Sequence, residues 1–247
     1  KKIAASLPAS KGNATVTLIR LLAWSGEKSF FRNVMPLTDS DDIAIRAAAI
    51  TALPALASYN DQQEIIDRLE ATSERAEVTE LQRALLNAAM QGDTPESRSA
   101  VILKALDSSR DRLKLIPLLA GTGGDEALKT VAAEFENGDA ITRDVCFDAL
   151  SHWTDHSASK ALLNITASGN KTFGRPAFDA YMRMIAAAPL TRERKLLMIK
   201  DIAPFAAAPD ARAGMVAFAA SLAVRQAEFF VAPYLSDPDE EVRNAAL

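Results

Sequence analysis

The stretch that decides the fold is Leu37-Thr38-Asp39-Ser40-Asp41-Asp42, which leads into Ile45-Arg46-Ala47-Ala48-Ala49-Ile50-Thr51-Ala52-Leu53. The same phrase returns as Leu235-Ser236-Asp237-Pro238-Asp239-Glu240 followed by Val242-Arg243-Asn244-Ala245-Ala246-Leu247. A third copy is Gly138-Asp139-Ala140-Ile141-Thr142-Arg143 with Cys146-Phe147-Asp148-Ala149-Leu150, and a weaker fourth is Phe178-Asp179-Ala180-Tyr181. Such self-similarity is typical of repeat proteins, in which each unit packs on its neighbours.

Each copy has the pattern of a turn that opens a helix. An Asp in the turn can accept hydrogen bonds from the free N–H groups of the next helix and interacts favourably with the helix dipole. The apolar residues that follow recur at i, i+3 or i+4, and i+7, which places them on one helical face. Because no runs of alternating apolar and polar residues are present, we expect an all-α protein without a sheet.

At these residues the sequence resembles the HEAT-repeat family, whose units turn on Asp or Pro and open a helix with Val-Arg-x-x-Ala-x-x-Ala-Leu. The resemblance implies that residues 1–247 form a single right-handed α-solenoid of about seven to eight helix pairs. It also implies that the repeat arginine bonds the turn aspartate of an adjacent unit, which here pairs Arg46, Arg143 and Arg243 with Asp39, Asp139 and Asp237. A tetratricopeptide array needs a rigid period with its own signature, and an armadillo array needs a third helix per unit, and the sequence offers neither.

The same pattern predicts the remaining helices. Inner helices are expected over about 14–24, 42–58, 76–91, 110–120, 140–153, 173–187, 210–225 and from 240 onward. Outer helices are expected over about 28–37, 61–72, 95–107, 125–136, 157–168, 192–207 and 227–235. Prolines recur inside these apolar phrases, which predicts kinked helices at Pro36, Pro54, Pro117, Pro204 and Pro233.

Composition and charge narrow the possible partners. Lys and Arg total 28 against 32 acidic residues, so the net charge is −4. Nucleic-acid binding is therefore not expected, because it normally needs a basic surface. The longest uncharged stretch near the end, 213–224, is too short to cross a bilayer, so no membrane span is expected.

Both ends of the sequence predict a fragment of a longer protein. The chain starts at Lys1 without an initiator Met, and it stops at Leu247 inside an expected helix. Ile3 and Leu7 precede Pro8 and are four residues apart, so we interpret them as the remnant of an outer helix.

Residues that often carry chemistry point to structural roles here. His152 and His156 flank Thr154-Asp155, which is expected to be a turn, so no zinc site is predicted. The glycine-rich stretch 121–125 lacks the Gly-Lys-Ser/Thr of a phosphate-binding loop and is expected to link two helices. Cys146, Trp24 and Trp153 are expected in the core. We therefore predict no catalytic residue, no metal and no cofactor.

The expected function is that of an interaction scaffold. A solenoid presents an extended concave surface, which suits a protein or peptide partner, including other domains of the same longer chain. Alignment to the HEAT pattern predicts the groove residues Thr51, Arg83, Asn87, Asp144, Asp148, Arg175, Asp179 and Arg183. The alternative is an enzyme on the same scaffold, similar to the HEAT-like DNA glycosylases or bilin lyases.

Overall fold

The computed structural model describes residues 6–247, which form helices and no strand. The described residues divide into two compact units, one ending at Cys146 and one comprising Phe147–Leu247. The all-α prediction is therefore confirmed for the described part of the chain. Leu7 opens the short 3-10 helix η1 (Leu7–Ala9) and is buried, whereas Ile3 lies outside the described residues.

The first unit contains α2 (Asn13–Ser25), α3 (Phe31–Val34), α4 (Ile43–Leu56), α5 (Gln62–Ala71), α6 (Arg75–Ala89), α7 (Pro95–Leu106), α8 (Ile116–Thr122) and α9 (Asp125–Asn137). Helix α10 (Ala140–Ser151) contains the boundary between the units. The second unit contains α11 (Ser159–Ala167), α12 (Gly174–Ala187), α13 (Arg192–Ile202), α14 (Pro209–Ser221), α15 (Arg225–Val231) and α16 (Glu240–Ala245). Most predicted ranges agree to within a few residues.

Short 3-10 helices extend many of these elements. They are η2 (Lys28–Phe30), η3 (Met35–Asp39), η4 (Tyr59–Asp61), η5 (Arg112–Lys114), η6 (His156–Ala158), η7 (Ala203–Phe205) and η8 (Ala232–Ser236). The expected helix 110–120 is thus split into η5 and α8.

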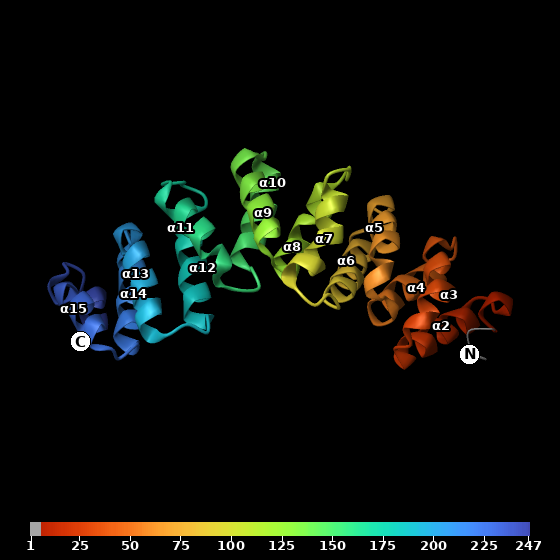
Figure 1. The fold of residues 1–247 in the computed structure, drawn as a ribbon, viewed down its shortest axis with the longest axis horizontal. Coiled ribbons are helices and arrows are strands. Elements are labelled where there is room, and N and C mark those ends of the chain that lie inside the picture. The colour runs from red at the N-terminus through yellow and green to blue at the C-terminus, as the bar shows by residue number, and fades with distance from the viewer. Residues whose placement is uncertain (1–5) are drawn as a thin grey trace. The chain divides into compact units, whose positions relative to one another are not determined.

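Within each unit, helices pack against the next helix and the next but one. In the first unit α4 packs on α2 and α6, α6 packs on α8, and α7 packs on α5 and α9 (Figure 1). In the second unit α14 packs on α12 and α16, and α13 packs on α15. We call α2, α4, α6 and α8, and likewise α12, α14 and α16, the even layer of their unit.

Helix α6 shows why these sequences pack in layers. Its buried residues, Leu81, Ala84, Leu85, Ala88 and Ala89, recur at helical spacing, so one stripe faces the neighbouring helices. Three of the five are Ala, a strong helix former whose small side chain allows close approach.

Turn aspartates cap the helices that follow them, as predicted. Asp42 accepts hydrogen bonds from the N–H groups of Ala44 and Ile45 at 2.9 and 3.3 Å. Asp139 accepts from the N–H of Thr142 at 2.8 Å. Asp239 caps α16 in the same way, so the capping role of the turn aspartate is confirmed.

The predicted pairs between repeat arginines and turn aspartates do not form as ion pairs with the aspartate carboxylates. Arg46 forms an ion pair with Glu77 at 3.0 Å, and the carboxylate of Asp39 is contacted by Arg68 instead. Asp237 pairs its carboxylate with Arg212, at 3.1 Å.

The repeat arginines donate to backbone carbonyls in the last turn of the preceding helix or at the residue just after it. Arg46 donates to the carbonyl of Ser40 at 2.6 Å, and Arg243 donates to the carbonyl of Asp237 at 2.8 Å. Arg143 donates to the carbonyls of Phe135 and Glu136, near the end of α9. The last carbonyls of a helix lack intrahelical partners, so they attract these cations.

The prolines mostly end a helix rather than kink it. At Pro36, Pro204 and Pro233 the α-helix gives way to a 3-10 segment, because proline supplies no N–H for the next α-helical bond. Pro117 stands in the first turn of α8, and Pro54 lies inside α4. None of the described helices is long and apolar enough to cross a membrane.

Candidate binding grooves

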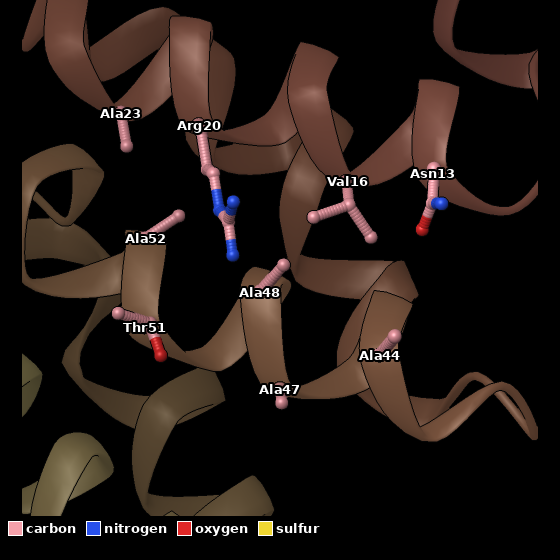
Figure 2. Close-up of a pocket in the computed structure, with 9 residues that line it drawn as sticks. All are labelled: Asn13, Val16, Arg20, Ala23, Ala44, Ala47, Ala48, Thr51 and Ala52. Atoms are coloured by element: carbon pink, nitrogen blue, oxygen red, sulfur yellow. The ribbon is translucent and has the colours of Figure 1, made fainter.

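The first unit has a groove between α2 and α4, which we call the α2–α4 groove. Its volume is about 450 Å³, and its walls are mostly alanine (Figure 2). The lining residues are Asn13, Val16, Arg20, Ala23, Ala44, Ala47, Ala48, Thr51 and Ala52. Arg20 extends from α2 toward α4 and has no hydrogen bond or ion pair with any described residue. This groove therefore presents one cation above a small apolar floor.

The second unit has a groove between α12 and α14, which we call the α12–α14 groove. Its volume is about 420 Å³. Its apolar lining is Phe178, Met182, Ala186, Ala211, Gly214, Met215 and Phe218. A Cβ added to Gly214 would meet no atom within 4 Å, so the groove is open at this point. Methionine adapts its shape to different apolar partners, so this floor suits an apolar side chain.

An ion cluster forms one wall of the α12–α14 groove. The Nε of Arg175 lies 3.0 Å from both carboxylate oxygens of Asp179, one turn later on α12. Its Nη1 and Nη2 bond the carboxylate of Asp210 on α14 at 2.9 and 2.7 Å. These hydrogen bonds from Arg175 lower the pKa of Asp210 to about 2. The bidentate geometry fixes all three side chains across the two helices.

Arg183 also lines the α12–α14 groove and belongs to no such cluster. It is exposed, and no hydrogen bond or ion pair joins it to another described residue. The same side chain lines a neighbouring hollow of about 370 Å³, which we call the Trp153 hollow. The other lining residues are Ser151, Trp153, Thr154, Asp155, His156, Met184, Ala187, Ala188 and Pro189. Arg183 thus stands between two mostly apolar surfaces.

Two residues that line the Trp153 hollow have buried polar atoms without a partner. Trp153 is 5% exposed, and neither its Nε1 nor the Oγ of Ser151 has a hydrogen-bond partner among the described residues. Asp155 uses one carboxylate oxygen to accept from the N–H of Ser157 at 2.7 Å. A buried donor without a partner is costly, so these two atoms lower the stability of the hollow's wall.

Four of the eight predicted groove residues line these grooves. Thr51 lies in the α2–α4 groove, and Arg175, Asp179 and Arg183 lie in the α12–α14 groove. Asp210 is not among the predicted residues, because its partner Arg175 lies on another helix, far away in the sequence.

The other four predicted residues lie on the surface outside the grooves. On α6, Arg83 pairs with Glu80, and the Nδ2 of Asn87 donates to the carbonyl of Pro54 at 3.2 Å. On α10, Asp144 and Asp148 are exposed, and Asp148 lies 3.3 Å from His152.

Arg20, Met182, Met215 and Phe218 were not predicted as groove residues. Arg20 follows Val16 by one turn within an expected inner helix, which is a signal that it shares that helix's groove side. The apolar three carry no such signal, because a groove floor has the same composition as a core.

The histidine pair lies across a turn, as expected. Helix α10 ends at Ser151, and His156 opens η6, so Thr154 and Asp155 fall between helices. The Nδ1 of His152 lies 2.9 Å from the carbonyl oxygen of Asp148. Residues 6–247 contain no group of three or more His, Cys, Asp or Glu side chains placed to hold a metal ion.

The glycine-rich stretch is a connection between helices, as predicted. Gly123 and Gly124 have φ of 72° and 99° and join α8 to α9. Those backbone angles favour glycine, which explains the composition without a bound anion.

The two tryptophans differ, although both end an apolar helical phrase. The prediction that Trp153 is buried is confirmed, whereas the prediction for Trp24 is wrong, since its side chain is 88% exposed. The buried residues of α2, including Val16, Ile19 and Leu22, share one face, and Trp24 lies on the opposite face.

Cys146 is fully buried, as predicted, and this gives a chemical test. Burial, with a contribution from Glu134 and against that of Arg112, raises the pKa of its thiol to about 12. Because the thiolate is the reactive form, we expect the native protein not to react with a colour-forming disulfide reagent at about pH 8. Unfolding in denaturant should release one reactive thiol per chain. Rapid stoichiometric reaction of the native protein would contradict the buried position.

Comparisons with known proteins do not assign a family. No family model and no curated protein matches the chain. One matching solved structure is a crystal structure of an engineered protein from the Northeast Structural Genomics Consortium. It is 16% identical, the match covers 99% of this chain and 92% of that one, and the TM-score is 0.30. A likeness this weak does not bear on fold or function.

Proposed function

We propose that the chain is a HEAT-like helical-repeat module that binds a peptide segment of a protein partner. In this proposal the helix pairs form a right-handed α-solenoid, and the even layers supply the binding surface. The turn aspartates that cap the following helices, and the packing of each helix on the next but one, support it.

The observation that carries the proposal is the α12–α14 groove. It combines an apolar floor of Phe and Met side chains with a charged wall held in place by bidentate hydrogen bonds. Arg175, Arg183 and Gly214 are all exposed, so the groove lies open along the helices. Small metabolites prefer concave sites that bury most of their surface, whereas an open groove between helices suits a peptide.

The charges of this groove favour binding over catalysis. Asp210 and Asp179 are both bonded to Arg175, and the pKa of Asp210 is about 2. A carboxylate with so low a pKa is a weak base and carries no proton to donate near neutral pH. The lining holds two Arg and two Asp, so it also lacks the excess positive charge that a nucleic-acid backbone needs.

The test is selection of binding peptides from a phage-displayed random library. The selected peptides are then synthesised and their affinities for the protein are measured. Gly214→Trp fills the open point of the groove, and the Cβ of the new side chain meets no atom within 4 Å. We expect selected peptides to bind wild type and to lose about tenfold or more affinity for Gly214→Trp. Circular dichroism should show an unchanged helix content, since glycine is a poor residue for a helix interior.

The matched control is Ala217→Trp. Ala217 is exposed on the same helix and does not line the groove. It should leave the affinity within about twofold of wild type. If no selected peptide distinguishes Gly214→Trp from Ala217→Trp, the groove is not a peptide site and the proposal fails.

A further inference from the structure

The guanidinium of Arg183 lines both the α12–α14 groove and the Trp153 hollow and forms no hydrogen bond or ion pair with another described residue. Of the four charged side chains that line the groove, three form one cluster, because Asp179 and Asp210 both accept hydrogen bonds from Arg175. Arg183 has no polar partner among the described residues. An unpaired Arg retains all five of its N–H donors for a ligand and matches the geometry of a carboxylate.

Apolar surface lies on both sides of Arg183. On the groove side are Met182, Met215 and Phe218, and on the side of the Trp153 hollow are Ala187 and Pro189. A segment that crosses Arg183 therefore meets an apolar surface, then a cation, then a second apolar surface.

We propose that the bound segment carries one Asp or Glu flanked by apolar side chains, with the carboxylate paired to Arg183. This inference rests on the proposed function and specifies the chemistry of its partner. The apolar residue on one side fills the α12–α14 groove, and the residue on the other side packs in the Trp153 hollow.

The electrostatics around Arg183 favour one carboxylate over a polyanion. Asp179 and Asp210 lie in the same groove, while Asp155 and His156 lie in the Trp153 hollow. No ion pair joins Asp155 to Arg183 in the described part of the chain. A nucleic-acid strand with closely spaced phosphates would be repelled by the carboxylates of Asp155, Asp179 and Asp210. A single carboxylate can instead pair with Arg183 alone.

Arg183→Glu provides the test through a charge swap. Peptides selected from the random library on wild type should carry an acidic residue between two apolar ones. The synthesised peptide should lose about tenfold or more affinity for Arg183→Glu, and replacing its acidic residue by Lys should restore binding to that variant only. Binding to wild type should also change the emission of Trp153 in a Trp24→Phe background, because Trp153 lines the hollow.

Arg192→Glu is the control for net charge. Arg192 is exposed on α13, lines neither the groove nor the hollow, and has no polar partner among the described residues. Peptide affinity should be the same for this variant as for wild type. Some peptides bind Gly214→Trp more weakly than wild type. If these peptides bind Arg183→Glu with wild-type affinity, this inference is wrong and the proposed peptide groove is retained. If no peptide depends on Gly214, the proposed function fails and this inference fails with it.

Discussion

Replacing Glu77 by Gln is expected to lower the free energy of unfolding of the first unit by about 3 kcal/mol. Glu77 lies in the first turn of α6 and accepts hydrogen bonds from Arg46 at 3.0 Å, Arg68 at 2.9 Å and Thr72 at 2.7 Å. The side chains of Arg68 and Glu77 are only 9% and 15% exposed. The Glu77 carboxylate therefore joins α4, α5 and α6, and Arg68 extends the cluster to η3 by donating to the carbonyl of Thr38.

The cost arises because Gln leaves charged partners behind. A neutral amide leaves the nearly buried guanidinium of Arg68 with only the exposed carboxylate of Asp39 at 3.3 Å, and its NH₂ group faces other donors. Denaturant unfolding followed by circular dichroism measures the loss. The matched control is Glu80→Gln, one turn further along α6, where an exposed pair with Arg83 should contribute less than about 0.5 kcal/mol. Equal effects of the two substitutions would contradict the buried role of Glu77.

The contribution of Glu77 should also depend on pH in a defined direction. Burial opposes its ionisation, but hydrogen bonds from Thr72, Arg46 and Arg68 outweigh burial and lower its pKa below the ordinary value of 4.5. The stability that Glu77 contributes is therefore complete above about pH 4.5 and is lost as the pH falls through the lowered pKa. The gap between wild type and Glu77→Gln should be constant near neutral pH and shrink on acidification. A gap that widens in acid would contradict the assigned pKa direction.

The sequence predicted helices and caps well because these features are local. Asp42 and Asp239 stand at fixed distances before apolar stripes, and a cap needs only the backbone of the next turn. The partner of a repeat arginine is not local. Arg46 bonds Glu77 on the next even-layer helix and the carbonyl of Ser40, which precedes α4. These partners depend on how two neighbouring repeats pack against each other.

The groove shows the same division between local and distant signals. Arg175 and Asp179 are one helical turn apart, so their proximity can be read from the sequence. Asp210 completes their cluster from another helix, and no spacing rule connects it to them. Trp24 and Trp153 have similar sequence contexts and opposite exposures, because burial depends on which elements cover a helical face.

Replacing Tyr181 by Ala is expected to destabilise the second unit by about 3–5 kcal/mol. Tyr181 is 2% exposed on α12, and its hydroxyl donates to the carbonyl of Met198 on α13 at 2.9 Å. Removing the ring leaves a cavity between two helices that the surrounding core fills only in part. Denaturant unfolding followed by the fluorescence of Trp153, in a Trp24→Phe background, reports on this unit.

Tyr181→Phe separates the packing of the ring from its hydrogen bond. It keeps the ring, so it should cost only about 1 kcal/mol. Burial, together with Asp201 and against Arg194, raises the pKa of Tyr181 to about 12. The advantage of wild type over Tyr181→Phe should therefore hold below about pH 10 and disappear as the pH rises through about 12. If Tyr181→Ala costs no more than Tyr181→Phe, the ring does not hold α12 against α13. The position of Arg175, Asp179 and Arg183 on α12 would then depend on other contacts.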